Sequence, residues 1–169
     1  MEPGRIVLCV SDPQWTLEAL HLAGAVASDF GYRVALVQLV SVDHPLLLGT
    51  EEAYSRYTTA DQEKLREYAA ALEAYGVLFD SYVYPYVSMA SAIVDIAEQL
   101  EACIVFATLP HGLFQFWRRF RLWTIRHRLR QRDCPLYTLD TPLETLVWTP
   151  ASASRLRHPS HRSEEFVQK

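Results

Sequence analysis

Short apolar runs rich in β-branched residues alternate with amphipathic segments along most of this chain. The strand-like runs are residues 5–11, 32–42, 79–87, 103–107 and 136–139. The helix-like segments are residues 13–30, 51–75, 89–100 and an arginine-rich stretch within 111–132. Continuous apolar runs indicate strands buried on both faces, and a helix after each strand indicates parallel pairing. The sequence therefore predicts an α/β fold, a three-layer sandwich in which helices cover both faces of a five-stranded parallel sheet.

Residue types at the ends of these segments support the boundaries. Asp12 precedes Pro13, which is the order expected for a helix N-cap followed by proline at the first helical position. Gly31 and Gly76 each follow a helix-like segment, where glycine commonly adopts the left-handed conformation that ends a helix. Pro85 lies within the third strand-like run and predicts that this strand has an exposed or irregular end.

The 169-residue chain is long enough for one domain with an extension. We expect residues 1–140 to form the α/β domain and residues 141–169 a C-terminal extension. Residues 150–169 are rich in Ser, Arg, His and Glu and lack apolar spacing, so we expect this tail to be flexible unless a partner orders it. No apolar run approaches the roughly 18 residues of a membrane span, and the first strand begins near the N-terminus without a signal peptide. A cytoplasmic protein is therefore expected.

The residues that usually carry metal or covalent chemistry do not form a recognisable motif. Cys9, Cys103 and Cys134 lack the CxxC spacing of a metal or redox site, so we expect reduced, buried thiols and no metal. The sequence contains no Gly-x-Ser-x-Gly elbow, no Ser-Gly-Gly-x-Asp-Ser pyrophosphatase loop and no His-Ile-Gly-His element of adenylyl transferases. These observations favour a protein that is not an enzyme and leave only weak ATP hydrolysis open.

The charge of the chain is unevenly distributed. Residues 111–132 contain seven arginines and no acidic residue. The chain has 16 basic and 20 acidic residues in all, so nine basic residues face twenty acidic ones elsewhere. A single basic segment on an acidic body is a local feature, and it argues against nucleic acid as the partner.

The arginine-rich segment also has two apolar faces when it is placed on a helix. Ile125 and Leu129 lie with Leu122 on one face, and the opposite face is aromatic. The residues of the aromatic face are Leu113, Phe116, Trp117, Phe120 and Trp123. Either the chain bends near residues 117–122, or one face meets something other than the sheet. Three partners fit this pattern: a second subunit, an anionic membrane surface, or an anionic ligand held by arginine side chains. A solvated arginine face over a buried aromatic core is the alternative.

The order of elements and the residues around the fourth strand resemble the universal stress protein family. The resemblance covers residues 4–140 and rests on the long second helix, Ser88-Met89-Ala90, and the region from Ala107 to Leu139. ATP-binding members of the family carry Gly-x-x-Gly, nine residues and Gly-Ser or Gly-Thr, before a Cys-Pro or similar pair. Counted back from Cys134-Pro135, Leu109 replaces the first glycine and Leu122-Trp123 replace the last pair. His111 and Gly112 are kept.

This resemblance implies a Rossmann-like fold of the universal stress protein and adenine nucleotide alpha hydrolase type, with a site for ATP or another adenine nucleotide. The candidate positions are Val10, Ser11, Asp12, Leu39, Val40, His111 and Gly112. Asp12 is equally explained as a helix cap, Leu39 and Val40 as core residues, and His111 as a loop histidine. Without its glycines the loop loses the close approach of backbone N–H groups to phosphates, so we predict that this ATP loop is lost. We expect Leu109 and the Leu122-Trp123 pair to fill the space.

Three hypotheses for function follow. The first is a non-enzymatic stress-response or regulatory protein that acts by binding a protein partner. The second is an adenine-nucleotide (ATP or AMP) sensor in which Arg118, Arg119 and Arg121 hold the phosphates. The third is a peripheral membrane adaptor that uses the basic aromatic segment 113–132. The resemblance also implies a homodimer paired through the last strand, residues 136–139, extended by residues 143–148.

Overall fold

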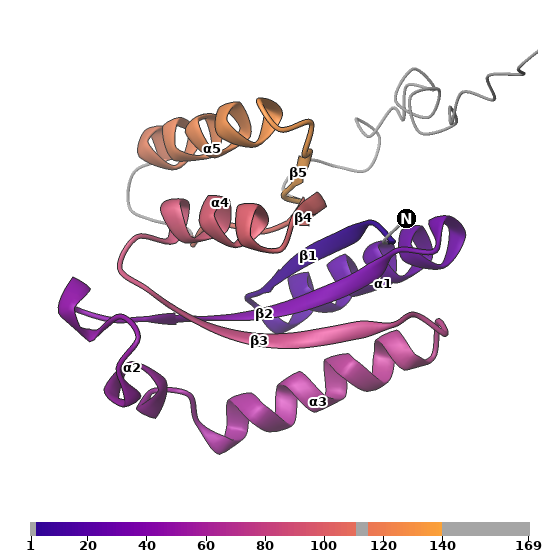
Figure 1. Cartoon of the computed structure of the whole chain (residues 1–169), viewed down its shortest axis with the longest axis horizontal. Helices are drawn as coiled ribbons and strands as arrows, with labels where there is room; N and C mark the ends of the chain where they lie inside the picture. Colours follow the sequence, from indigo (N-terminus) through magenta and orange to yellow (C-terminus); the bar gives the residue numbers. More distant parts are fainter. Residues whose placement is uncertain (1–2, 111–114, 140–169) are drawn as a thin grey trace, which may run out of the picture.

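A five-stranded, all-parallel sheet forms the centre of the molecule, in the order β3-β2-β1-β4-β5 (Figure 1). The computed structural model describes residues 3–110 and 115–139. Its strands are β1 Arg5–Val10, β2 Arg33–Ser41, β3 Phe79–Tyr86, β4 Ala102–Phe106 and β5 Leu136–Tyr137. The predicted extension 141–169 and the flexibility expected of its tail lie outside the described residues.

Helices cover both faces of this sheet, which confirms the three-layer α/β prediction. The long helices are α1 Pro13–Phe30, α3 Thr59–Glu73, α4 Met89–Gln99 and α5 Gln115–Arg130. Ile6 and Leu8 of β1 pack into one apolar cluster with α1 and α3. Val7 and Cys9 point the other way, into a cluster with α4 and α5. Because both sides of β1 are buried, its sequence is a continuous apolar run rather than an alternating one.

The start and end of α1 follow the predicted signals. The Asp12 carboxylate accepts hydrogen bonds from the backbone N–H groups of Gln14 (3.0 Å) and Trp15 (3.4 Å), and Pro13 is the first helical residue. Gly31 ends the helix with a φ of 67°. That left-handed conformation favours glycine because a Cβ would be strained there. Local residue types thus determine both ends of α1.

The single helix predicted over residues 51–75 is wrong. Two helices occupy this segment, α2 Glu51–Ser55 and α3, and a short 3-10 turn, Pro45–Leu47, precedes them. Thr58 begins α3 with a capping box. Its hydroxyl accepts from the N–H of Asp61 (3.2 Å), and the Asp61 carboxylate accepts from the N–H of Thr58 (3.0 Å). Because an N-cap residue has a non-helical backbone, one continuous helix cannot pass through Thr58.

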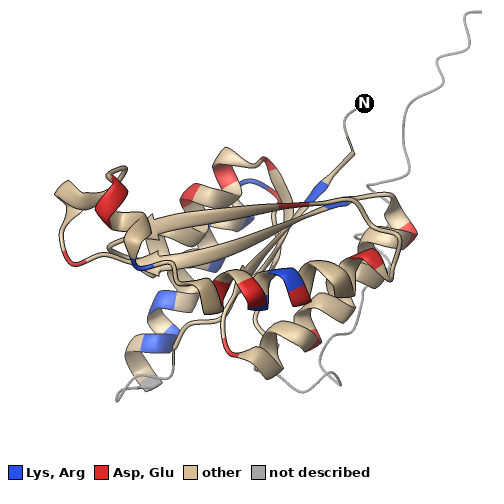
Figure 2. Ribbon diagram, turned by 90° about the horizontal axis from the view of Figure 1, so that it is seen from below, with Lys and Arg blue, Asp and Glu red and all other residues tan. Residues whose placement is uncertain are grey.

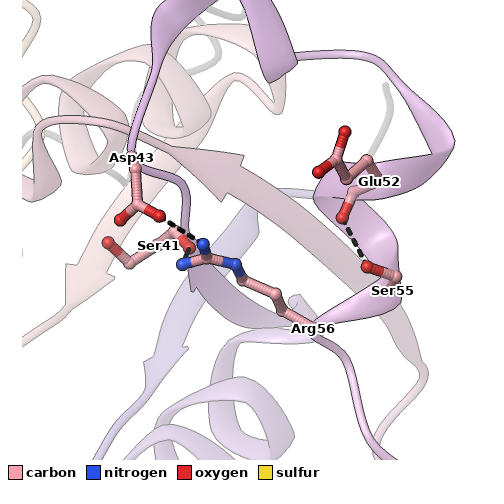
Figure 3. Close-up of polar contacts among 5 residues, drawn as sticks. All are labelled: Ser41, Asp43, Glu52, Ser55 and Arg56. Carbon is pink, nitrogen blue, oxygen red and sulfur yellow. Dashed lines mark hydrogen bonds and ion pairs between the residues drawn. The ribbon is translucent and has the colours of Figure 1, made fainter.

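Arg56 fastens α2 to the end of β2 (Figure 3). Its guanidinium donates to the carbonyl oxygen of Ser41 at 3.1 Å and forms an ion pair with Asp43. The Ser55 hydroxyl donates to the carbonyl of Glu52 at 2.7 Å within α2. The Arg56 guanidinium lowers the pKa of Asp43 below its ordinary value by hydrogen bonding and charge. The connection between β2 and α3 is therefore held against the carboxyl edge of the sheet.

The two edge strands of the sheet, β3 and β5, each differ from a regular strand. Pro85 lies in β3, which forms one edge of the sheet, opposite Val40 of β2. An edge strand tolerates proline because one side of its backbone bonds no neighbouring strand of the sheet. Pro85 is half-buried and keeps the register with β2, so the exposed or irregular end predicted for this strand is not seen there. At the other edge β5 is shorter than the predicted run 136–139. Leu139 has a φ of 52°, a left-handed conformation that does not continue a strand.

The cysteines are free, as predicted: Cys9 and Cys134 are buried and Cys103 is half-buried. Burial raises the pKa of Cys9 and of Cys134 to about 12. Within residues 3–110 and 115–139, no helix is both long and apolar enough to cross a membrane. No group of three potential metal ligands occurs in that same part of the chain.

Candidate functional site

The candidate nucleotide residues that the structure describes lie mainly at the carboxyl edge of the sheet. Val10 ends β1, and Leu39 and Val40 lie near the end of β2; all three are buried. Ser11 and Asp12 follow β1 and are exposed. The carboxyl edge is where open α/β sheets generally bind ligands. His111 and Gly112 lie outside the described residues.

The polar groups that follow β1 form hydrogen bonds within the turn that starts α1. The Ser11 N–H donates to the hydroxyl of Thr16 at 3.0 Å, and Thr16 is fully buried. The Asp12 carboxylate caps α1, and the backbone carbonyl oxygen of Asp12 accepts a hydrogen bond from the Thr16 N–H at 2.8 Å. The arrangement fits the helix-cap interpretation of Asp12.

The loop after β4 is tied to the first turn of α5. Leu109 is 5% exposed and packs in the same apolar cluster as Ile125 and Leu129 of α5. Its carbonyl oxygen accepts a hydrogen bond from the Nε–H of Arg118 at 3.2 Å. Leu109 stands where the family motif has a glycine, and here its side chain fills the core beneath the loop.

Trp15 makes a connection that the sequence did not reveal. Its indole N–H donates to the carbonyl of Thr138 at 2.8 Å, which joins the first turn of α1 to the end of β5. Arg126 of α5 reaches the Thr138 hydroxyl at 3.5 Å. Trp15 lies within the segment 13–30 that the sequence predicts as a helix, and nothing in that segment indicates a contact partner 123 residues away along the chain.

The outer face of α5 carries four exposed aromatic side chains, which we call the aromatic stripe. Phe116 is 75% exposed, Trp117 59%, Phe120 53% and Trp123 60%. On the opposite side of the helix Ile125 is 1% exposed and Leu129 is fully buried. The aromatic face therefore points away from the sheet, and the alternative of a buried aromatic core is wrong for the described residues. That this face meets a partner stays a prediction. α5 has no break, since one helix spans Gln115–Arg130.

The orientation of α5 corrects the expectation for Leu122 and Trp123. Leu122 is half-buried and packs against the core cluster shared with α4. The Trp123 indole instead points outward and stacks between Phe120 and His127, at ring-centroid distances of 6.1 and 5.5 Å. Consecutive residues of a helix are about 100° apart, so burying Leu122 turns Trp123 away from the core.

Arginines flank the aromatic stripe. α5 contains six arginines and no acidic residue (Figure 2). Arg119, Arg121, Arg128 and Arg130 are exposed, and none of the ion pairs found among the described residues involves them. Arg118 differs from these four because it is half-buried and its Nε–H points to Leu109. The three arginines predicted to hold phosphates therefore do not converge: Arg118 faces the loop, and Arg119 and Arg121 face solvent.

A hollow of about 410 Å³ lies at the ends of β3 and the start of α4. Tyr54, Tyr84, Tyr86, Ser88 and Asp95 are among its lining residues. None of the described nucleotide candidates lines it. The hollow lies at β3, two strands from β1 in the sheet, whereas the resemblance places the nucleotide at the ends of β1 and β2.

Solved structures share the fold of this chain over most of its length. A universal stress protein family member from Burkholderia pseudomallei superposes with a TM-score of 0.58 at 16% identity, covering 82% of this chain and 96% of that one. The chain has the universal stress protein fold. The universal stress protein UspA from Lactobacillus plantarum gives a TM-score of 0.54 at 14% identity, over 81% of this chain and 97% of that one. No protein-family model and no curated protein matches the sequence.

Structures with this fold include nucleotide complexes. One of them is a universal stress protein in complex with cAMP, with a TM-score of 0.54 at 15% identity, covering 79% of this chain and 94% of that one. The likeness confirms the predicted universal stress protein fold. The segment that the resemblance assigns to the phosphates begins at Leu109, and its residues 111–114 lie outside the described part.

Proposed function

We propose that this chain is a non-enzymatic regulatory protein of the stress-response type, which acts by binding an anionic partner through α5. The supporting observation is the aromatic stripe, four large rings left in solvent on a helix with six arginines. Removing a large apolar side chain from water into a packed interior or interface contributes about 1.5–3 kcal/mol of favourable free energy. Adjoining rings left exposed on one helix therefore favour an interaction surface.

The sheet edge offers less support for the family's nucleotide mode. Leu109 occupies the first glycine position with a buried side chain, and its carbonyl is bonded to Arg118. The Asp12 carboxylate accepts hydrogen bonds from two backbone N–H groups at the start of α1. Binding through backbone N–H groups needs a loop that approaches the phosphates closely, which a buried leucine opposes. Recognition of a partner by α5 needs neither a glycine loop nor the Asp12 carboxylate.

Retention on a sulfonate cation-exchange resin at neutral pH tests this proposal. The chain has a net charge of −4, so retention requires a local basic cluster. We expect Arg119→Gln/Arg121→Gln to elute at lower salt than the wild type. Lys64→Gln/Arg66→Gln is the matched control, because it removes the same charge from exposed positions of α3. Equal elution of the two double variants, or no retention of the wild type, would contradict the proposal.

An adenine-nucleotide sensor is the second candidate, and the position of Arg118 favours it. Arg118 lies beside the loop after β4, at the carboxyl edge of the sheet. A rearrangement that frees its guanidinium from the Leu109 carbonyl would let it contact a phosphate. Calorimetric titration with Mg-ATP and with cAMP separates this candidate from the first.

We also propose a homodimer that pairs through β5. This strand is an edge of the sheet, and Leu136 and Tyr137 are half-buried in the single chain. An unpaired edge with apolar side chains favours pairing with a second copy. Residues 143–148, expected to extend the pairing, lie outside the described residues. Light scattering at micromolar concentration tests this point, and a monomeric mass would contradict it.

A further inference from the structure

We propose that the anionic partner of α5 is a lipid bilayer surface, on which the helix lies flat with its aromatic stripe at the level of the headgroups. The inference rests on the proposed function and names its partner. It is drawn from the order of residues around α5, from the stacking of its rings and from the charge of the rest of the chain.

The residues around α5 are arranged as in an interfacial helix. At about 100° per residue, the four rings of the aromatic stripe span roughly 120°, centred opposite Ile125 and Leu129. Arg119 and Arg130 border the stripe on one side, and Arg121 and Arg128 border it on the other. A helix that lies in a membrane interface has this pattern, because its rings enter the boundary of the acyl chains while arginines on both flanks reach lipid phosphates.

The helix is also accessible to a flat surface. α5 packs on α4 and β5, and its aromatic face points away from both. α5 forms the outer layer at one side of the described molecule, beyond α4 (Figure 1). A fluid bilayer adapts to a linear stripe of rings, whereas a protein partner would need a groove of matching shape.

The rings of the aromatic stripe contact one another and form a continuous apolar surface. Trp123 lies between Phe120 and His127, at interplanar angles of 27° and 13°. These contacts cover the indole only in part, since Trp123 is 60% exposed and Phe120 53%. The exposed parts of these rings would enter a bilayer interface.

The charge of the remaining chain orients the contact. Outside residues 111–132 the chain has nine basic and twenty acidic residues, so an anionic surface repels most of the molecule and attracts α5. We expect binding to depend both on the electrostatic attraction of the arginines and on burial of the aromatic rings. Removing either the arginines or the rings should weaken it.

Vesicle flotation of the full chain tests the inference. Phosphatidylcholine vesicles with phosphatidylserine should carry the protein up the gradient, and vesicles of phosphatidylcholine alone should not. Phe120→Ser/Trp123→Ser should lose binding, and Arg119→Gln/Arg121→Gln should weaken it about tenfold or more. The matched controls are Leu46→Ser/Leu78→Ser, which changes two exposed apolar residues elsewhere, and Lys64→Gln/Arg66→Gln. Circular dichroism of each variant confirms that the fold is kept.

The outcomes separate this inference from the proposed function. Retention on the sulfonate resin without binding to phosphatidylserine vesicles would overturn the bilayer and leave an anionic protein as the partner. Binding of a single-stranded oligothymidylate in place of vesicles would also overturn it. Loss of both resin retention and vesicle binding would remove the inference and the proposed function together. Equal flotation of the α5 variants and their controls would place any membrane contact elsewhere.

Discussion

The Nε–H of Arg118 donates to the carbonyl oxygen of Leu109 at 3.2 Å, which joins the first turn of α5 to the loop that follows β4. The Leu109 side chain lies in the core under this contact, with 5% of its surface exposed. The Leu109 side chain and carbonyl thus both hold the loop. A glycine at this position would keep the carbonyl acceptor but would lose the buried side chain.

Leu109→Ala should lower the free energy of unfolding by about 2–5 kcal/mol, because it leaves a cavity under the loop. Urea unfolding followed by circular dichroism measures the change. Leu46→Ala is the control, since Leu46 is 90% exposed and its change should stay within about 0.5 kcal/mol. Equal unfolding midpoints for the two variants would show that Leu109 is not packed as described.

Wild-type protein stripped of nucleotide should give no saturable heat with Mg-ATP or cAMP. The reason is the loss of the glycine loop, in which Leu109 now belongs to the core. A Leu109→Gly/Leu122→Gly/Trp123→Ser variant restores the family pattern, with circular dichroism as the check on its folding. Binding only by the variant would mean that side chains block an inherited pocket. Micromolar binding by the wild type would instead favour the nucleotide sensor.

Asp12→Ala should destabilise the protein by about 1 kcal/mol, because the carboxylate caps two backbone N–H groups of α1. Asp12→Asn should retain most of that stability, since asparagine is an equally good N-cap. Thermal unfolding of the two variants side by side gives the comparison. If both variants match the wild type, the cap is not what stabilises the start of α1.

Alkaline pH should weaken the fold through the buried thiols. Burial raises the pKa of Cys9 from its ordinary value of 9.0 to about 12. On raising the pH, the Cys9 thiol ionises in the unfolded chain before it ionises in the folded one. The stability that the protonated thiol contributes is therefore fully present below about pH 9 and is lost as the pH rises toward 12. At about pH 10 the loss through Cys9 alone should be about 1.4 kcal/mol. Urea unfolding at about pH 8 and about pH 10 should show a smaller pH effect in Cys9→Ala than in the wild type; equal effects would contradict this.

The sequence predicted the parts of the fold that depend on local residue types. The continuous apolar run of β1, the cap at Asp12 and the turn at Gly31 all act within a few residues, so their patterns are visible in the chain itself. The capping box at Thr58 is also local, and recognising Thr58-x-x-Asp61 as a helix start would have divided the helix predicted over residues 51–75. Pro85 indicated only an exposed or irregular end of its strand, and that β3 lies at the edge of the sheet was decided by the order of the strands.

The sequence alone determined the three-layer α/β fold and the two apolar faces of α5, because both follow from the periodicity of the chain. Only the tertiary structure decided which face is buried. A helix can pack just one of two opposite faces on the layer beneath it. Ile125 and Leu129 fit the core beside α4 and Leu109, so the aromatic stripe is left in solvent. The connection from Trp15 to Thr138 was likewise decided by tertiary structure, because it joins residues that are brought together only when the sheet assembles.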